Sequence, residues 1–161
     1  TPPMADALTP GMVVAGTYEV ERLLGRGGMG EVWLGRHQRL QGKQVAIKWM
    51  HPHLAATPDA AERLLREARA SSKLSHPNVV DVYDVVRDDQ TLFLVMELLQ
   101  GETLREYLRN NPNPKLSEFI GLLMGAMAGV AAAHEVSAGI GASIDLDAAT
   151  CAFTQPIVGA P

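Results

Sequence analysis

The stretch LLGRGGMGEVWLGRH, residues 23–37, places four glycines within six positions, between two segments that alternate as β-strands do. Gly25, Gly27 and Gly30 have the spacing G-x-G-x-x-G, and Gly28 is an additional glycine. Glycine adopts positive φ and has no Cβ, so the backbone amides of such a loop can approach a ligand, typically a phosphate. The pattern by itself is weak, and a glycine-rich hairpin turn without a ligand is the alternative interpretation.

The residues after the glycines separate three kinds of nucleotide-binding loop. A Walker A loop ends in Gly-Lys-Ser/Thr, but Gly30 is followed by Glu31 and Val32. A dinucleotide-binding fold begins a helix at its glycines, whereas EVWLGRH has the alternation of a strand. The loop is therefore predicted to join two antiparallel strands. A glycine hairpin over phosphates, with valine two positions after the last glycine, is typical of protein kinases.

Two further motifs follow in the order that a kinase requires. VAIK, which ends at Lys48, closes a third strand and supplies a lysine for phosphates. AAERLLREARASSKL, residues 60–74, has helical spacing and carries Glu67, a counter-ion for that lysine. Taken singly, Lys48 can be a solvated strand residue and Glu67 can pair with an arginine of its own helix. Their order after the glycine loop favours the functional interpretation.

The segment from about Tyr18 to Leu108 resembles the N-terminal lobe of a bacterial Ser/Thr protein kinase of the eukaryotic-like (Hanks) type. LLGRGGMGEVW, VAIK, REARA, SHPNVVDVYDV and LFLVMELLQGETL carry the resemblance. It implies an α+β fold, a five-stranded antiparallel sheet with one packed helix, followed by one C-lobe helix and an irregular tail. It also implies ATP and Mg2+ as cofactors.

The resemblance further implies a nucleotide site, with Lys48 and Glu67 as its catalytic pair. The glycines cover the phosphates, Lys48 contacts the α- and β-phosphates, and Glu67 holds Lys48 in position. Apolar side chains sandwich the adenine, a gatekeeper follows, and the hinge backbone pairs with the adenine. The residues assigned to nucleotide binding are Leu24, Gly25, Gly27, Gly28, Gly30, Val32, Ala46, Lys48, Met96, Glu97 and Leu99.

The later sequence KLSEFIGLLMGAMAGVAAAHEVSAGI resembles the long helix that opens the kinase C-lobe. Its uncharged stretch Phe119–Ala133 is shorter than a membrane span requires, so we expect a buried helix and no membrane segment. Gly121, Gly125 and Gly129 recur at every fourth position. They mark either a close approach of another segment or ordinary core glycines.

Beyond the helix the family motifs are not found in this sequence. The fourteen Lys and Arg residues all lie at or before Lys115, so the His-Arg-Asp loop has no arginine here, and neither Asp-Phe-Gly nor Ala-Pro-Glu occurs. SIDLDAAT, residues 143–150, can be aligned with the catalytic loop, which makes Asp145 a weak candidate base, with chance similarity as the alternative. Magnesium ligands are not identifiable, and no metal site is predicted.

These observations predict a flexible leader over residues 1–16, a kinase N-lobe over 17–100, the helical start of a C-lobe over 101–138 and an irregular tail over 139–161. The chain has no basic patch, which argues against nucleic-acid binding. The single cysteine, Cys151, favours a reducing cytosol.

The sequence thus predicts the ATP-binding portion of a Ser/Thr protein kinase, truncated before or through the catalytic loop. As this isolated chain it is expected to be inactive in phosphoryl transfer. Its expected partners are ATP and a protein substrate or a partner kinase. The alternative function is a non-catalytic, pseudokinase-like module that binds a nucleotide or a partner protein.

Overall fold

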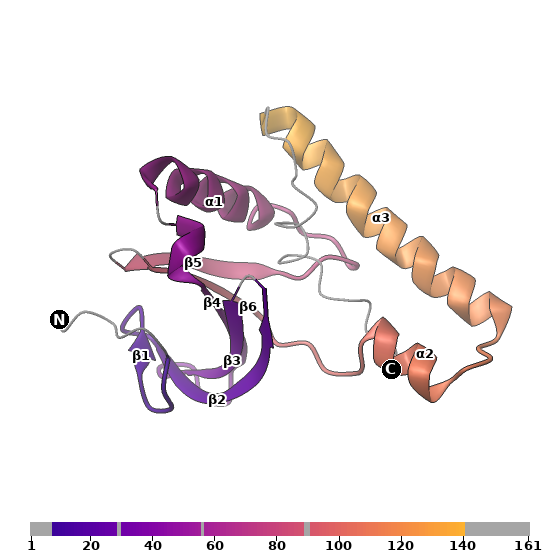
Figure 1. Cartoon of the computed structure of the whole chain (residues 1–161), viewed down its shortest axis with the longest axis horizontal. Helices are drawn as coiled ribbons and strands as arrows, with labels where there is room; N and C mark the ends of the chain where they lie inside the picture. Colours follow the sequence, from indigo (N-terminus) through magenta and orange to yellow (C-terminus); the bar gives the residue numbers. More distant parts are fainter. Residues whose placement is uncertain (1–7, 29, 56, 89–90, 141–161) are drawn as a thin grey trace. The chain divides into compact units, whose positions relative to one another are not determined.

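The structure, a computed structural model, describes residues 8–140 apart from residues 29, 56 and 89–90 (Figure 1). For some of these residues, including Glu67, it describes the backbone alone. The chain divides into two compact units. The first contains the residues up to Arg69 together with Val82–Leu98, and the second contains Ala70–Asp81 together with the residues from Leu99 onward.

The first unit is built on a six-stranded antiparallel sheet with the strand order β1-β2-β3-β4-β6-β5. Its strands are β1 (Val13–Val14), β2 (Tyr18–Gly27), β3 (Gly30–His37), β4 (Gln44–Met50), β5 (Val82–Asp88) and β6 (Thr91–Glu97). The α+β architecture that we predicted is confirmed. The sheet has six strands instead of five because the two-residue strand β1 adds to its edge beside β2.

Residues 8–16 belong to this folded unit, which corrects the expectation of a flexible leader over 1–16. Leu8 and Val14 are only 4% and 1% exposed, and Val14 pairs with Tyr18 of β2. A tight three-residue turn, residues 15–17, reverses the chain between the two strands, with positive φ at Ala15 (54°) and Gly16 (61°). The first seven residues lie outside the described part of the chain.

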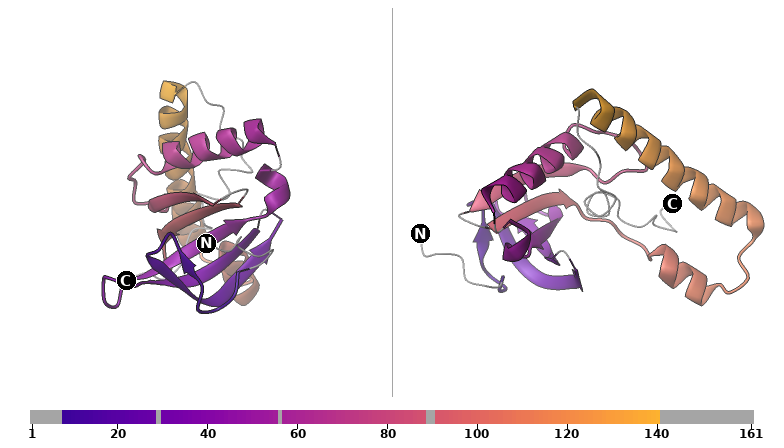
Figure 2. Two further views of the ribbon diagram at one scale, coloured as in Figure 1. Left: turned by 90° about the vertical axis from the view of Figure 1, so that its left-hand side faces the viewer. Right: turned by 45° about the horizontal axis from the view of Figure 1, so that its top comes forward.

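The sheet curves strongly, and a buried core cluster lies on one of its faces. β2 carries two irregularities in its pairing with β3, and such bulges bend a strand and increase its twist; Figures 1 and 2 show the resulting arc. β6 lies between β4 and β5 with five consecutive residues buried, so both of its faces are covered. The buried core cluster contains Leu8, Val14, Tyr18, Val20, Trp33, Val45, Ile47, Trp49, Phe93 and Val95.

Two helical segments follow β4 in the first unit, the short 3-10 helix η1 (Pro52–Ala55) and α1 (Pro58–Ser71). Leu65 and Ala68 of α1 are buried, at 5% and 7% exposure. Glu62 of α1 forms an ion pair with Arg87 of β5, with 3.5 Å between Oε1 and Nη1. The helix is therefore attached to the β5 side of the sheet.

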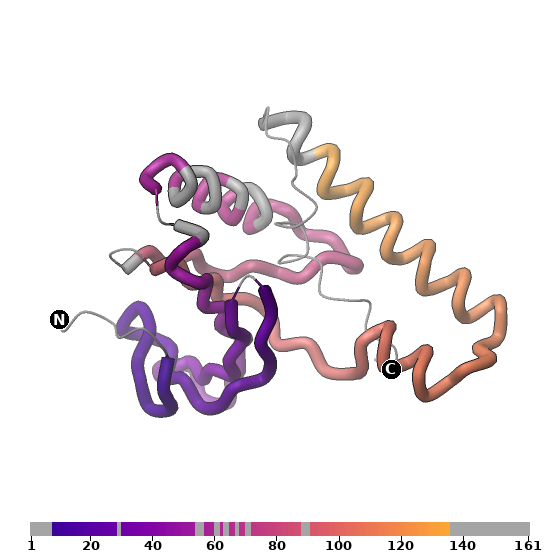
Figure 3. Tube along the Cα trace, in the orientation of Figure 1, coloured from indigo at the N-terminus to yellow at the C-terminus, as the bar shows by residue number. Residues whose placement is uncertain are grey.

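The second unit contains α2 (Leu104–Asn110) and α3 (Leu116–Ile140), and Figure 3 traces the chain through both. Thr103 caps α2: its hydroxyl accepts from the Glu106 amide (3.1 Å), and the Glu106 carboxylate accepts from the Thr103 amide (2.8 Å). This reciprocal pair of hydrogen bonds gives acceptors to two backbone amides that have no partner within the helix. Tyr107 donates its hydroxyl hydrogen to Glu118 of α3 (3.2 Å), which joins the two helices.

A close approach of backbones joins α3 to the turn around Asn78 within the second unit. A Cβ on Gly129 would lie 2.7 Å from the Asn78 carbonyl oxygen, and one on Gly125 would lie 3.1 Å from the Asn78 side-chain nitrogen. A Cβ on Gly121 would meet nothing within 4 Å. Two of the three recurring glycines therefore mark a close approach, and the third does not.

The helix α3 confirms the expected helix but not its expected burial. Over its described side chains, Gly129 and Ala133 are buried, whereas Leu116 (72%), Met124 (63%) and Met127 (68%) are exposed. By length and composition alone, Leu116–Glu135 is apolar enough to cross a membrane. This is weak support for a span, because the core helix of a soluble protein has the same composition.

Candidate nucleotide-binding site

The sheet register brings four of the predicted nucleotide residues to one face of the first unit. Val32 of β3 is paired with Lys48 of β4, and Ala46 of β4 is paired with Met96 of β6. Directly paired residues share a face of the sheet, and alternate residues of one strand do so too. Since Ile47 belongs to the core cluster, this second face is the one opposite the core.

Among the described side chains on this face, Lys48 is the cation and the others are mainly apolar. Ala46 and Met96 are 6% and 3% exposed, and Val32 and Lys48 are half-buried. Leu94, which is paired with Lys48 on the other side, is 6% exposed and extends the apolar surface. An apolar area beside a single ammonium group matches the two halves of a nucleotide, a flat base and a charged phosphate chain.

The glycine hairpin joins this face at its edge. Gly25 is paired with Val32, and Gly27 with Gly30, so the hairpin tip continues the row that contains Lys48. A Cβ on Gly25, Gly27 or Gly28 would meet no heavy atom within 4 Å. The fold itself therefore does not require glycine at these three positions, and the open space suits a ligand that contacts the backbone.

Gly30 is glycine for a different reason. Its φ is +153°, and a Cβ on it would lie 1.9 Å from the carbonyl oxygen of Trp49 in the neighbouring strand. No side chain fits that gap. Within the G-x-G-x-x-G pattern, one glycine thus serves the packing of β3 on β4, and the others leave room above the hairpin.

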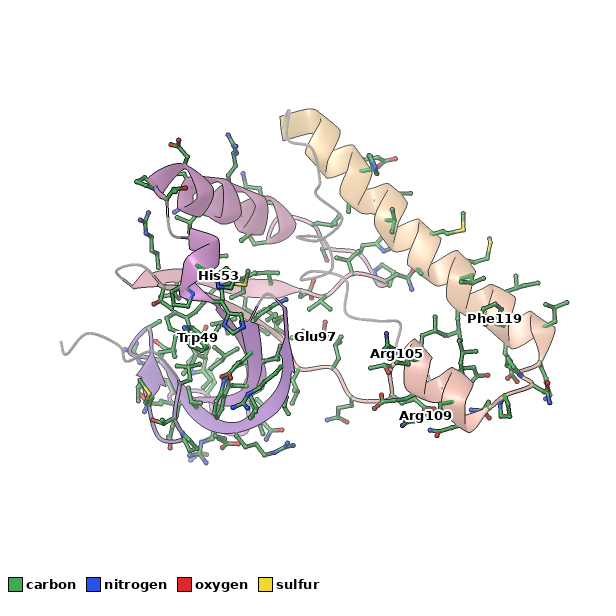
Figure 4. The ribbon with its side chains drawn as sticks, viewed as in Figure 1. Trp49, His53, Glu97, Arg105, Arg109 and Phe119 are labelled. Atoms are coloured by element: carbon green, nitrogen blue, oxygen red, sulfur yellow. The ribbon has the colours of Figure 1, made fainter. Side chains whose placement is uncertain are left out.

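The remaining predicted nucleotide residues are Leu24 and Glu97 of the first unit and Leu99 of the second. Leu24, in the irregular part of the β2–β3 pairing, is 39% exposed. Glu97 ends β6 and is labelled in Figure 4, and Leu99 follows it in a segment without regular structure; both are half-buried. The chain passes from the first unit to the second between Leu98 and Leu99.

The partner proposed for Lys48 is only partly described. Glu67 belongs to α1, but its side chain lies outside what the structure describes, so the Lys48–Glu67 pair stays a prediction. Asp145 lies outside the described residues altogether. Among the described residues, no group of three or more His, Cys, Asp or Glu side chains is placed to hold a metal ion.

Two residues that the sequence analysis left unassigned stand out beside the glycines. Arg26 and Glu31 are cross-strand partners, and Arg26 Nε lies 2.8 Å from Glu31 Oε1. The sequence does contain a signal for this pair: residues of opposite charge stand on either side of the segment 27–30, where a hairpin brings them across from each other.

The comparisons with known proteins bear on the family and the fold of the chain. The protein kinase domain model matches residues 18–140. Serine/threonine-protein kinase pkn2 of Myxococcus xanthus is 42% identical over 124 residues, and PrkC of Bacillus subtilis is 34% identical over 125 residues. These alignments cover 77% and 78% of this chain but only 15% and 19% of the relatives.

Solved kinase structures give the same result for the fold. The crystal structure of the Mycobacterium tuberculosis PknI kinase domain matches with a TM-score of 0.69 and 29% identity. The match covers 80% of this chain and 53% of that one. The chain thus spans about half of a solved kinase domain and less than a fifth of the two relatives above. On these matches and on its sheet, the chain belongs to the protein kinase family, among the bacterial Ser/Thr protein kinases.

Proposed function

We propose that this chain is the ATP-binding portion of a kinase that transfers the γ-phosphoryl group of ATP to Ser or Thr hydroxyls of proteins. The observation that carries the proposal is the shared face of Val32, Ala46, Lys48 and Met96, with the open glycine hairpin at its edge. Adenine stacks between the apolar side chains, and the phosphates lie between the hairpin amides and Lys48. The cytosol, where ATP is abundant, is its proposed location.

As this 161-residue chain, the protein is proposed to bind ATP without transferring its phosphate. Phosphoryl transfer requires metal ions and a base beside the acceptor hydroxyl, in addition to the cation that Lys48 supplies. The sequence contains no catalytic-loop or magnesium-loop motif from which those groups are assigned. Mg2+, when bound with ATP, neutralises phosphate charge, and this chain contributes the lysine and the glycine amides.

Calorimetric titration of the chain with ATP and Mg2+ tests the proposal. Lys48→Met removes the ammonium group, and we expect ATP affinity to fall by at least about tenfold, the range of one charge-assisted contact to phosphate. Lys43→Met is the matched control. Lys43 lies just before the same strand, but its Nζ lies over the ring of Tyr83, 4.4 Å from the ring centroid, and is not assigned to the phosphates. Equal affinity of the wild type and Lys48→Met contradicts the proposed site.

A phosphotransfer assay with a generic protein substrate separates the catalytic function from the non-catalytic one. No turnover together with ATP binding supports the inactive nucleotide-binding form, which includes the pseudokinase-like alternative. Turnover that disappears in Lys48→Met shows that the chain is catalytically competent and that the expected inactivity is wrong.

A further inference from the structure

Among the residues that the structure describes, Glu31 is the charged residue with a buried side chain. It is not one of the residues assigned to nucleotide binding. Glu31 is 8% exposed. Its Oε1 accepts from Arg26 Nε at 2.8 Å, and its Oε2 accepts from Trp33 Nε1 at 3.0 Å. A buried carboxylate is costly unless donors compensate it, and here both oxygens have one. We call this group of Arg26, Glu31 and Trp33 the Glu31 bridge.

The Glu31 bridge connects the tip of the glycine hairpin to the core of the sheet. Arg26 lies in β2 between Gly25 and Gly27, directly across from Glu31 in β3. Trp33 is two residues further along β3, on the same face, and is 7% exposed within the core cluster. The bridge therefore lies on the face opposite Val32 and Lys48, behind the surface assigned to the nucleotide.

The hairpin tip has few other side-chain contacts to hold it. Gly25, Gly27 and Gly28 have no side chains, and open space surrounds the positions where their Cβ atoms would be. Glycines give a segment a wide choice of backbone conformations, and folding restricts that choice at an entropic cost. Among the described residues, the Arg26–Glu31 ion pair is a side-chain interaction that spans this tip, with 2.8 Å between Nε and Oε1.

We propose that Glu31 is a positioning residue of the nucleotide site: through Arg26 and Trp33 it holds the glycine hairpin in the conformation whose amides face the phosphates of ATP. The inference rests on the ATP binding proposed above. A hairpin that spends less time in the competent conformation binds phosphates more weakly in proportion to that fraction. Binding of the adenosine part, on Val32, Ala46 and Met96, is not affected in this way.

The test compares ATP with adenosine in calorimetric titrations of the 161-residue chain. We expect Arg26→Ala and Glu31→Ala to weaken ATP binding by about tenfold, with adenosine affinity changed by less than about twofold. Glu31→Gln keeps one acceptor oxygen and is expected to fall between Glu31→Ala and the wild type. The double variant Arg26→Ala/Glu31→Ala is expected to bind no more weakly than Glu31→Ala, because both changes break the same bridge.

Arg36→Ala is the matched control for Arg26→Ala. Arg36 is also an exposed arginine of the same two strands, paired with Glu19 at 3.2 Å, but it lies at the end of the hairpin away from the glycines. We expect Arg36→Ala to leave the ratio of ATP affinity to adenosine affinity unchanged. Because the Arg26 side chain is 70% exposed, Arg26→Ala is expected to fold normally even if Glu31→Ala does not.

Amide hydrogen exchange without nucleotide provides a second readout. Exchange over residues 25–32 is expected to speed up in Arg26→Ala and Glu31→Ala but not in Arg36→Ala. Suppose that the wild type binds ATP, and that Arg26→Ala keeps the same ratio of ATP affinity to adenosine affinity and the same exchange rates. The inference about Glu31 is then overturned, while the proposed ATP binding stands. A wild-type chain without ATP affinity overturns the proposed function, and the nucleotide role of Glu31 with it.

Discussion

Two glycine-rich regions of this protein use the same residue for different purposes. In the β2–β3 hairpin, Gly25, Gly27 and Gly28 have open space where a Cβ would stand. In α3, a Cβ on Gly125 would lie 3.1 Å from the side-chain nitrogen of Asn78, and a Cβ on Gly129 would lie 2.7 Å from its carbonyl oxygen. The hairpin glycines leave open space where the proposed phosphates fit, whereas two of the helix glycines leave room for another segment of the chain itself. The difference separates the proposed phosphate site from a packing contact.

Gly30 is the exception within the hairpin, and its replacement has the largest expected effect. Gly30→Ala places a methyl group 1.9 Å from the Trp49 carbonyl oxygen, at a φ of +153°. Steric overlap and backbone strain together are expected to lower the free energy of unfolding by about 3–5 kcal/mol. Urea denaturation followed by tryptophan fluorescence, which reports on the sheet that contains Gly30, measures the loss. A loss below about 1 kcal/mol would show that β3 and β4 move apart easily here.

Gly129 tests the packing role of the helix glycines. Gly129→Ala puts a Cβ 2.7 Å from the backbone oxygen of Asn78. A backbone oxygen, unlike a side-chain atom, cannot relieve the overlap by changing rotamer. Overpacking costs about 1–3 kcal/mol, and the better helix propensity of alanine offsets about 1 kcal/mol of it, so a net loss of about 1–2 kcal/mol is expected. Gly121→Ala is the control, and with open space around it should gain up to about 1 kcal/mol. Equal effects at both positions would remove the distinction between these two glycines.

Gly27 tests the opposite role. Gly27→Ala is expected to leave the free energy of unfolding unchanged or slightly higher, because its Cβ meets nothing and its φ is not positive. ATP affinity, measured by calorimetry, is expected to fall about tenfold because the methyl group occupies space proposed for the phosphates, a change worth about 1.4 kcal/mol. Unchanged ATP affinity would mean that the open space at Gly27 is not where the phosphates bind.

The smallest effect concerns the cap of α2 and depends on pH. Hydrogen bonds from Thr103 lower the pKa of the Glu106 carboxyl below its ordinary value. Because the folded pKa is the lower one, the cap stabilises the helix above the ordinary glutamate pKa, and this contribution disappears as the pH falls through the lowered value. The protection factor of the Thr103 amide, which is its intrinsic exchange rate divided by the observed rate, is expected to fall with acidification in the wild type. In Glu106→Gln this protection factor should not depend on pH over that range.

The part of the fold that a sequence can reveal is the part set by regular spacing. The strands around LLGRGGMGEVW and VAIK alternate over several residues, so their presence and order follow from the pattern. The face shared by Val32 and Lys48 depends on the register between the strands, which the structure gives. β1 has two residues and a turn with Ala15 at positive φ, which is too short for any period to show. For that reason the pattern predicts a flexible leader over residues 1–16, although Leu8 and Val14 are buried.

The candidate site shows the same division between pattern and contact. Spacing identifies the glycines as a group but does not separate Gly30 from Gly27, because the reason lies in β4, whose Trp49 carbonyl approaches from another segment. The pattern misses Glu31 because a glutamate in an alternating strand is normally a solvent-facing residue, and only its two donors, Arg26 and Trp33, explain its burial. The Lys48–Glu67 pair and Asp145 remain predictions from the family resemblance.

The placement of the tryptophans decides what an optical experiment on this chain reports. The chain has two, Trp33 and Trp49, and both are buried in the sheet core of the first unit. Their fluorescence therefore follows the sheet alone, whereas the helical circular dichroism comes largely from α2 and α3 of the second unit, with a smaller share from α1. If the two signals change at different urea concentrations, the simplest reading is that each unit unfolds separately. Neither signal by itself then gives a stability for the whole chain.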